Sequence, residues 1–278
     1  MKMQLEVKEV AVAYDGSTVI EGINFSLQPG EIGCLLGPSG CGKTSLLRAI
    51  AGFEPLARGE IRLHDRTVSQ PGNSVATEQR HVGMVFQDFA LFPHLSVAKN
   101  VAFGLKKHSP AEREQRVTEL LQLVGLEHLR EAHPHQLSGG QQQRIALIRA
   151  MAPRPDILLM DEPFSSMDAE LREQLAREVR ELLKRDGITA ILVTHDQLEA
   201  FAMADVIGVV GKGKLRQWGS GYTIYHQPAD RFVADFIGQG VMLPGEVINT
   251  SQVETELGII EGAIPEGCQP GCRIELLI

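Results

Sequence analysis

Short apolar runs bounded by turn residues recur along the chain, and such runs predict strands. Several of them are continuous rather than alternating, which is typical of strands buried on both faces of a sheet. The predicted strands are Leu5–Val12, Val19–Leu27, Ile32–Leu36, Ile157–Met160, Ile188–Thr194 and Val206–Val210.

Helical patterns occupy the stretches between these runs. Ser45–Ile50 predicts a helix directly after the third run. Residues 89–152 are helical in character, with one helix starting at a cap on Ser109 and another running from about Ser138 to Ala150. An apolar stripe within residues 171–183 predicts a long amphipathic helix.

Strands that alternate with helices predict an α/β fold with a mostly parallel sheet and helices packed on it. We therefore expect a large α/β domain over residues 1–235, with an inserted helical subdomain at about 89–155. Glu246–Leu257 and Arg273–Ile278 predict further strands separated by turn residues. These favour the start of a small β-rich domain over residues 236–278, which we expect to be truncated because its last strand ends with the chain.

Charge and composition narrow the function. The chain carries 27 Lys and Arg against 35 Asp and Glu, a net charge of −8, without clear basic clusters, so it is a poor candidate for binding nucleic acid. No apolar stretch approaches the roughly 20 residues that a membrane helix needs, and Met1–Val10 lacks the apolar stretch of a secretion signal. If the protein serves a membrane, we expect a soluble chain held there by a partner.

The cysteines give no strong signal of a disulfide or a metal site. Cys34 lies in an apolar run and Cys41 in a glycine-rich loop, while Cys268 and Cys272 flank a Gln-Pro-Gly turn with no second Cys or His pair nearby. Two unrelated thiols at a turn are favoured over a metal site, and free thiols suit a reducing cytoplasm.

A glycine-rich segment joins the third strand to the helix after it. Gly37–Thr44 reads G-x-x-x-x-G-K-T, the pattern of a phosphate-binding loop. Its glycines let several amide groups point at one phosphate chain, and the positive end of the following helix dipole adds to them. Lys43 would supply a charge to the β- and γ-phosphates, and Thr44 would offer a hydroxyl to Mg²⁺. The predicted strand and helix on either side argue against a chance glycine loop.

An acidic pair follows the buried strand Ile157–Met160. Asp161 stands at the carboxyl end of that strand, where it can hold the water shell of Mg²⁺, and Glu162 could polarise an attacking water. An Asp-Glu pair alone is a weak signal, because strands often end in acidic turns. Its weight comes from following a phosphate loop.

The pentapeptide Leu137–Gln141 discriminates among nucleotide-binding classes. Ser138 and two glycines at a predicted helix start expose amide hydrogens and a hydroxyl to an anion. Here the sequence resembles the ATPases of ABC transporters, whose signature it reproduces unaltered. In that family this helix start faces the γ-phosphate held by the other subunit.

The resemblance extends to four further positions. Gln87 stands where the family has a glutamine that touches Mg²⁺ and senses the membrane subunit, and His195 stands at the switch histidine. Tyr14 stands where an aromatic ring stacks on adenine, a contact worth roughly 1–3 kcal/mol in related cases. Asp168 is retained in a loop whose two preceding residues, Ser166 and Met167, depart from the family's usual Ala-Leu.

What the resemblance implies is an ATPase that uses ATP with Mg²⁺ in a head-to-tail homodimer, with nucleotide at the interface. It implies catalytic roles for Glu162, His195 and Gln87, and Mg²⁺ contacts from Thr44, Gln87 and Asp161. Nucleotide contacts are implied at Tyr14, Gly37, Pro38, Ser39, Gly40, Cys41, Gly42, Lys43, Thr44 and Ser45 of one chain, and at Ser138, Gly139, Gly140 and Gln141 of the other, with Asp168 near the seam.

The implied partners are transmembrane permease subunits docked near Gln87 and residues 89–152, and indirectly a periplasmic or surface solute-binding protein, with no nucleic acid. The implied location is the cytoplasmic face of the cell membrane, as a peripheral protein. Phe236–Pro244 is similar to the junction in the ferric-iron branch of maltose-type importers, which favours iron. Sulfate, polyamine, phosphonate and sugar importers remain alternatives because they share most of this motor sequence.

Three alternative functions share some of these features. A soluble ABC ATPase acting on DNA or ribosomes usually inserts a long coiled coil, and the spacing between Gln87 and Leu137 is too short for one. Exporter motors are commonly fused to membrane segments, and none is visible. A β-rich tail that senses a ligand and controls the motor is compatible with the importer hypothesis.

Overall fold

Strands and helices alternate along the chain as the apolar runs predict. The structure is a computed structural model that describes residues 2–165, 167, 169–238, 242–262, 264 and 267–277. The strands are β1 (Leu5–Tyr14), β2 (Ser17–Leu27), β3 (Ile32–Leu36), β4 (Arg58–Leu63), β5 (Arg66–Gln70), β6 (Asn73–Ser74), β7 (Val82–Val85), β8 (Ile157–Asp161), β9 (Thr189–Thr194), β10 (Val206–Gly211), β11 (Lys214–Gly219), β12 (Met242–Val247), β13 (Gln252–Thr255), β14 (Gly258–Glu261) and β15 (Arg273–Leu277). The α-helices are α1 (Lys43–Ala51), α2 (Val97–Ala102), α3 (Pro110–Leu123), α4 (Gly139–Met151), α5 (Ala169–Asp186), α6 (Gln197–Met203), α7 (Gly221–His226) and α8 (Arg231–Ile237).

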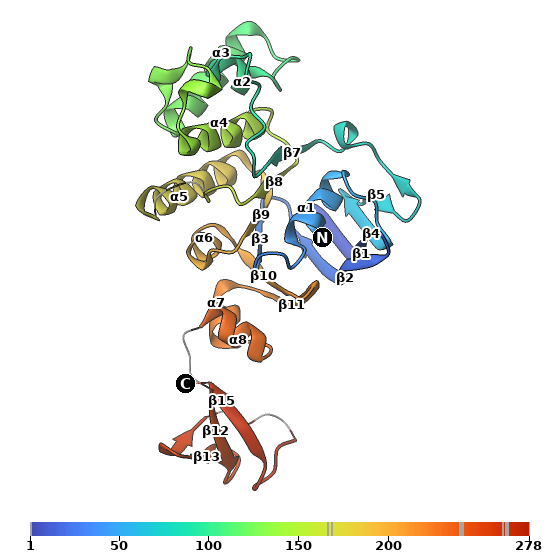
Figure 1. Cartoon of the computed structure of the whole chain (residues 1–278), viewed down its shortest axis with the longest axis vertical. Coiled ribbons are helices and arrows are strands. Elements are labelled where there is room, and N and C mark those ends of the chain that lie inside the picture. The colour runs from blue at the N-terminus through green and yellow to red at the C-terminus, as the bar shows by residue number, and fades with distance from the viewer. Residues whose placement is uncertain are drawn as a thin grey trace.

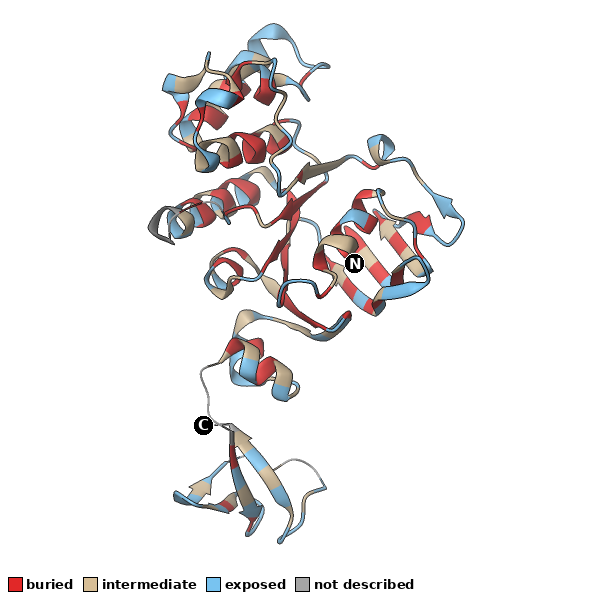
Figure 2. Ribbon diagram, in the orientation of Figure 1, coloured by how far each residue is buried: buried red, intermediate tan, exposed pale blue. Residues whose placement is uncertain are grey.

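A mixed sheet in the order β11-β10-β3-β9-β8-β7 forms the centre of the molecule (Figure 1). Its strands are parallel from β10 to β7, and only β11 runs antiparallel to its neighbour. Every residue of β3, β8 and β9 is buried, which explains their continuous apolar sequences (Figure 2). The predicted α/β fold with a mostly parallel sheet is confirmed.

An antiparallel sheet in the order β2-β1-β4-β5-β6 lies beside the central one, and α1 packs between the two (Figure 1). Apolar residues of both sheets and of α1 form one buried cluster, which includes Leu5, Leu46 and Ile191. The strands β4 to β7 were not predicted. In Arg58–Leu63, for example, Arg62 separates the two buried apolar residues, Ile61 and Leu63, so no apolar run marks the strand.

A buried arginine ties this antiparallel sheet to α1. The Arg80 side chain donates from Nη1 to the carbonyls of Ala49 and Ile50, 3.2 and 2.9 Å away, at the carboxyl end of α1. It also donates from Nη2 to the Val68 carbonyl and from Nε to the Val75 carbonyl, at 3.0 and 2.8 Å. Burial lowers the pKa of Arg80 to about 10.

Replacing Arg80 by Met should lower the free energy of unfolding by about 2 kcal/mol or more. The carbonyls of Ile50 and Val75 lose the donor described for them, and each buried acceptor left without a donor costs about 1–3 kcal/mol. Urea denaturation measures the change. The matched control is Arg66→Met, because Arg66 is exposed on the same sheet and this variant should unfold like the wild type. Equal midpoints for the two variants would contradict the structural role of Arg80.

The helices α2, α3 and α4 form a lobe above the central sheet (Figure 1). The predicted cap is present, since Ser109 Oγ accepts from the Glu112 N–H at 3.3 Å and the Glu112 carboxylate accepts from the Ser109 N–H at 2.9 Å. Apolar residues of this lobe belong to the same buried cluster as Leu158 and Leu192 of the central sheet. The lobe is therefore packed on the sheet rather than tethered to it.

The last part of the chain forms a small antiparallel sheet in the order β14-β13-β12-β15. The prediction of one strand over Glu246–Leu257 is wrong, because the chain turns between β12 and β13. The Asn249 side chain makes this turn by accepting from the Ser251 N–H at 2.9 Å. Among the described residues, no helix has the length and apolarity that crossing a membrane requires.

Candidate active site

The loop between β3 and α1 has a shape that only glycine permits at several positions. Gly40 and Gly42 have φ angles of 78° and 98°, in the left-handed region. A Cβ atom on Gly37 would lie 2.2 Å from the Val210 carbonyl oxygen. No side chain caps the start of α1, so its first amide groups point into the loop without a side-chain acceptor. Such an end of a helix binds phosphate groups.

Lys43 opens α1, and its side chain folds back into the loop. Its Nζ donates to the carbonyls of Gly37 and Pro38, at 2.7 and 2.9 Å, and the residue is 5% exposed. The ammonium group is thus held inside the ring of backbone that the glycines form. Ser45 lies half-buried in the next positions of the helix, whereas Pro38 and Ser39 are exposed at the loop tip.

Thr44 and Asp161 meet at the carboxyl edge of the central sheet, as their sequence positions predict. Thr44 Oγ1 donates to Asp161 Oδ1 at 2.9 Å. Asp161 is 3% exposed, and burial raises the pKa of its carboxyl, while the hydrogen bond from Thr44 opposes that rise. A desolvated carboxylate beside a hydroxyl suits a hard divalent cation such as Mg²⁺.

Gln87 faces the same space from the other side. A cavity of about 320 Å³ is lined by Gln87, Asp161, Arg48, Phe86 and Asp88. The structure therefore brings together two of the three residues for which Mg²⁺ contacts were predicted, and Thr44 bonds to one of them.

Asp161→Asn should raise the melting temperature of the protein measured without nucleotide or Mg²⁺ at pH 7. Because the folded pKa is raised, folding costs free energy when the carboxylate is charged, and this cost appears as pH rises through the folded pKa. Asparagine removes the charge and can still accept from Thr44. The variant should also lose any stabilisation by Mg²⁺ with ATP. A lower melting temperature for Asp161→Asn in the absence of ligands would contradict this account.

Glu162 and His195 lie side by side because their strands are neighbours in the sheet. Glu162 follows β8 and His195 follows β9, and His195 Nδ1 lies 3.3 Å from Glu162 Oε1. The Glu162 backbone N–H donates to the Val193 carbonyl at 2.9 Å, and its φ angle is +49°. A non-glycine residue in this region is strained, and such strain often accompanies functional sites.

The signature segment lies in the helical lobe. Ser138 caps α4, its Oγ accepting from the Gln141 N–H at 3.3 Å while Gln141 Oε1 accepts from the Ser138 N–H at 2.9 Å. Ser138 and Gly139 are exposed and Gly140 is half-buried. Within the described part of the chain, no hydrogen bond or ion pair joins this segment to the phosphate loop, and α4 and α1 stand in different parts of the molecule (Figure 1).

Tyr14 and Asp168 are the remaining residues predicted near the nucleotide. Tyr14 ends β1 and is 38% exposed on the hairpin whose second strand packs against Gly42 of the phosphate loop. Asp168 lies outside the described residues.

Gln143 is one of the residues near the site that were not predicted. Gln143 of α4 is buried and donates from Nε2 to the Glu162 carbonyl at 3.0 Å, which links the signature helix to the acidic pair of the same chain. Its position two residues after the signature is the only hint that the sequence offered.

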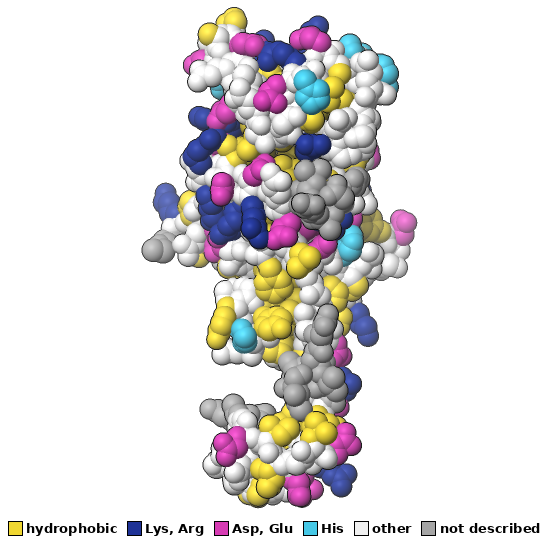
Figure 3. All heavy atoms as spheres, turned by 90° about the vertical axis from the view of Figure 1, so that its left-hand side faces the viewer, with side chains coloured by type: hydrophobic (Ala, Val, Ile, Leu, Met, Phe, Trp, Pro, Cys, Tyr) yellow, Lys and Arg dark blue, Asp and Glu magenta, His cyan; other side chains and the backbone are white. Residues whose placement is uncertain are grey.

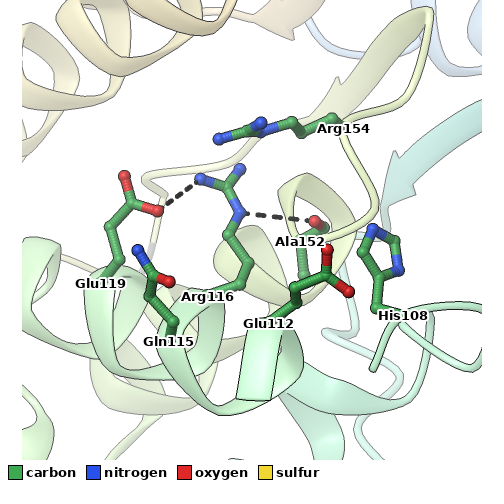
Figure 4. A pocket seen from close by; sticks show the side chains of 7 residues that line it. All are labelled: His108, Glu112, Gln115, Arg116, Glu119, Ala152 and Arg154. Atoms are coloured by element: carbon green, nitrogen blue, oxygen red, sulfur yellow. Dashed lines mark hydrogen bonds and ion pairs between the residues drawn. The ribbon is translucent and has the colours of Figure 1, made fainter. Parts of the chain in front are cut away.

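A second cavity, of about 330 Å³, lies between α3 and the end of α4 (Figure 4). Its main feature is Arg116, which bonds to Asp186 and to Glu119, both at 2.9 Å, and to the Ala152 carbonyl at 3.4 Å. These contacts tie α3 to the ends of α4 and α5, so the cavity lies at a joint between the lobe and the core.

Residues 20–165 match the sequence profile of the ABC transporter family. The chain belongs to this family and is an ATPase of the ABC transporter type. It is 44% identical to the Fe(3+) ions import ATP-binding protein FbpC 2 of Haemophilus influenzae, over 92% of this chain and 72% of that protein. It is 43% identical to the spermidine/putrescine import ATP-binding protein PotA of Vibrio parahaemolyticus, over 100% of this chain and 74% of that protein.

Solved structures agree with this assignment. The dimeric ATP-binding cassette MJ0796, in a post-hydrolysis state bound to ADP and Pi, aligns with a TM-score of 0.71 at 30% identity, over 78% of this chain and 98% of that one. The structure of cbiO1 from Clostridium perfringens, part of the ABC transporter complex cbiONQ, aligns with a TM-score of 0.70 over 79% of this chain and 89% of that one.

Proposed function

We propose that this chain is the motor subunit of a bacterial ABC importer and hydrolyses ATP at the carboxyl edge of its central sheet. The observation that carries the proposal is the convergence there of the phosphate loop, the Thr44–Asp161 pair and the Glu162–His195 pair. In this scheme Lys43 binds the β- and γ-phosphates. The backbone amides of the loop share that task.

Thr44, Asp161 and Gln87 are proposed to hold Mg²⁺, which would neutralise part of the phosphate charge. Glu162 orients the attacking water and accepts its proton, and His195 holds the γ-phosphate beside it. This chemistry consists of positioning and charge stabilisation, as is usual for phosphoryl transfer. Tyr14 is proposed to stack on the adenine, and Asp168 to lie near the seam of the dimer.

The complete site is proposed to form between two copies of the chain arranged head to tail. The exposed start of α4, with Ser138, Gly139, Gly140 and Gln141, then meets the γ-phosphate bound to the partner's loop. Two observations support this arrangement: the signature makes no described contact with its own loop, and the similar cassette MJ0796 is dimeric with ADP and Pi. ATP would close the dimer and hydrolysis would open it.

The cargo proposed is ferric iron, because the Haemophilus influenzae and Pectobacterium atrosepticum relatives are ferric-iron import proteins at 44% and 46% identity. A polyamine is the second candidate, because the chain is 48% identical to the PotA protein of Vibrio cholerae. Permease subunits would dock near Gln87 and the helical lobe at the cytoplasmic face of the membrane. A solute-binding protein would choose the cargo. Residues 1–235 are proposed as the motor domain and 236–278 as part of a β-rich regulatory domain.

The test is uptake by cells that lack this gene and are complemented with either the wild type or Glu162→Gln. Radioactive ferric iron and spermidine are supplied in parallel. Restoration of iron uptake by the wild type alone supports the proposal, whereas restoration of spermidine uptake alone favours the polyamine alternative. If neither uptake responds to the gene, both cargo assignments are wrong.

A further inference from the structure

Glu162 and His195 come from different segments, so contacts elsewhere must hold those two segments at a fixed distance from each other. Glu162 begins the loop that ends near Met167, whereas His195 lies between β9 and α6. Their side chains are 20% and 53% exposed, so packing alone does not fix the 3.3 Å separation between them.

Arg172, in the first turns of α5, contacts both segments. Its Nη2 donates to the Met167 carbonyl at 2.9 Å, and its Nη1 donates to Asp196 Oδ2 at 2.6 Å. Its Nε lies 3.6 Å from Glu199 Oε1. One guanidinium group therefore joins the loop after Glu162 to the residues that follow His195. The α5 and α6 face is turned toward the viewer in Figure 3, where basic and acidic side chains lie close together.

The two carboxylates that Arg172 contacts fix the backbone on both sides of His195. Asp196 caps α6, its Oδ1 accepting from the N–H groups of Leu198 and Glu199 at 2.8 and 3.2 Å. Thr194 Oγ1 donates to Glu199 Oε2 at 2.6 Å and accepts from the Asp196 N–H at 3.0 Å. Hydrogen bonds therefore hold the chain on both sides of His195, at Thr194 and at Asp196.

The Glu199 side chain is 3% exposed, and a buried carboxylate needs a positive partner. Arg172 is the cation that contacts it among the described ion pairs. A lysine could not make all of these contacts, because its ammonium is a single point charge. The planar guanidinium of arginine presents donors to several acceptors at once.

We propose that Arg172 is a positioning residue for ATP hydrolysis, which holds the Glu162 loop and the His195 segment at their catalytic separation through Met167, Asp196 and Glu199. This inference rests on the proposed roles of Glu162 and His195. Arg172 contacts neither side chain in the described hydrogen bonds and ion pairs, and it acts through the segments that carry them.

The first experiment measures kcat and KM for ATP with the purified full chain. Arg172→Ala should lower kcat by about 10²-fold with little change in KM, since misplacing catalytic groups by about 1 Å can cost that much. Arg172→Lys keeps the charge beside Glu199 and should show an intermediate kcat. Arg177→Ala is the matched control, because Arg177 lies on the same helix, is 68% exposed and pairs only with Glu173 among the described ion pairs.

The second experiment separates positioning from a general loss of stability. In a His195→Ala background, removing Arg172 should cost less in kcat than it costs in the wild type, because one of the two groups that it positions is already absent. Equal losses in both backgrounds would overturn the proposal, as would a wild-type kcat in Arg172→Lys. If Arg172→Ala does not fold, Arg172→Lys carries the same comparison.

Failure of the proposed ATPase function would give a different result from failure of the proposed role of Arg172. A wild-type chain that hydrolyses no ATP, or a Glu162→Gln variant with full turnover, would overturn the assignment of the site itself. An active wild type with additive effects of Arg172 and His195 would overturn only the role of Arg172.

Discussion

Glu162→Gln is expected to reduce ATP turnover by about 10²–10⁴-fold, the usual contribution of a general base. Glutamine keeps the size of the side chain but cannot accept the proton of the attacking water. ATP binding should be retained, since the phosphate loop and the Thr44–Asp161 pair are unchanged. Phosphate release measures turnover, and calorimetry measures binding.

The same variant tests the dimer. Because it would bind ATP without hydrolysing it, light scattering should show a monomer that becomes a dimer when ATP and Mg²⁺ are added. Glu181→Gln is the matched control, since Glu181 is exposed on α5, and it should turn over ATP like the wild type. Full activity of Glu162→Gln would rule out its role as the base, whereas a mass that ignores ATP would count against the interface at the signature.

Lys43→Ala is expected to weaken ATP binding by about 10- to 150-fold, because hydrogen bonds to charged groups contribute about 1.5–3 kcal/mol and each 1.4 kcal/mol is a factor of ten. The ammonium of Lys43 donates to two carbonyls of the phosphate loop, so it already lies within the loop that would bind the phosphates. Titration calorimetry with ATP and Mg²⁺ measures the change.

Lys107→Ala provides the comparison for that measurement. Lys107 is exposed in the helical lobe, and its loss should leave the affinity for ATP as it is in the wild type. An unchanged affinity in Lys43→Ala would contradict the interpretation of Gly37–Thr44 as a phosphate loop.

The strands and helices that could be predicted are those whose sequence pattern lies within a few neighbouring residues. Ile157–Met160 is a continuous apolar run because β8 is buried at every residue, and Ser109 with Glu112 caps a helix through contacts three residues apart. β4 and β5 were not predicted because they are partly exposed and carry polar residues between or beside their buried ones. Arg80 adds to the apolar contacts that hold this antiparallel sheet to α1, and its partners lie up to 31 residues away in the chain.

The candidate site divides in the same way. Lys43, Thr44, Asp161 and Glu162 stand in contiguous motifs, so their grouping could be predicted. Arg172 could not, since its contact with Asp196 spans 24 residues and depends on how α5 packs beside α6. The contact of Gln143 with the Glu162 carbonyl spans 19 residues and depends likewise on the packing of α4.

The separation of Ser138 from the phosphate loop within one chain has a genetic consequence. If each working site takes its loop from one copy and its signature from another, two damaged alleles can compensate for each other. A chain defective at Lys43 still offers an intact Ser138, and a chain defective at Ser138 still offers an intact Lys43. When both are made in the same cell, their mixed pairs should contain one intact site, so activity should return although neither allele has any alone.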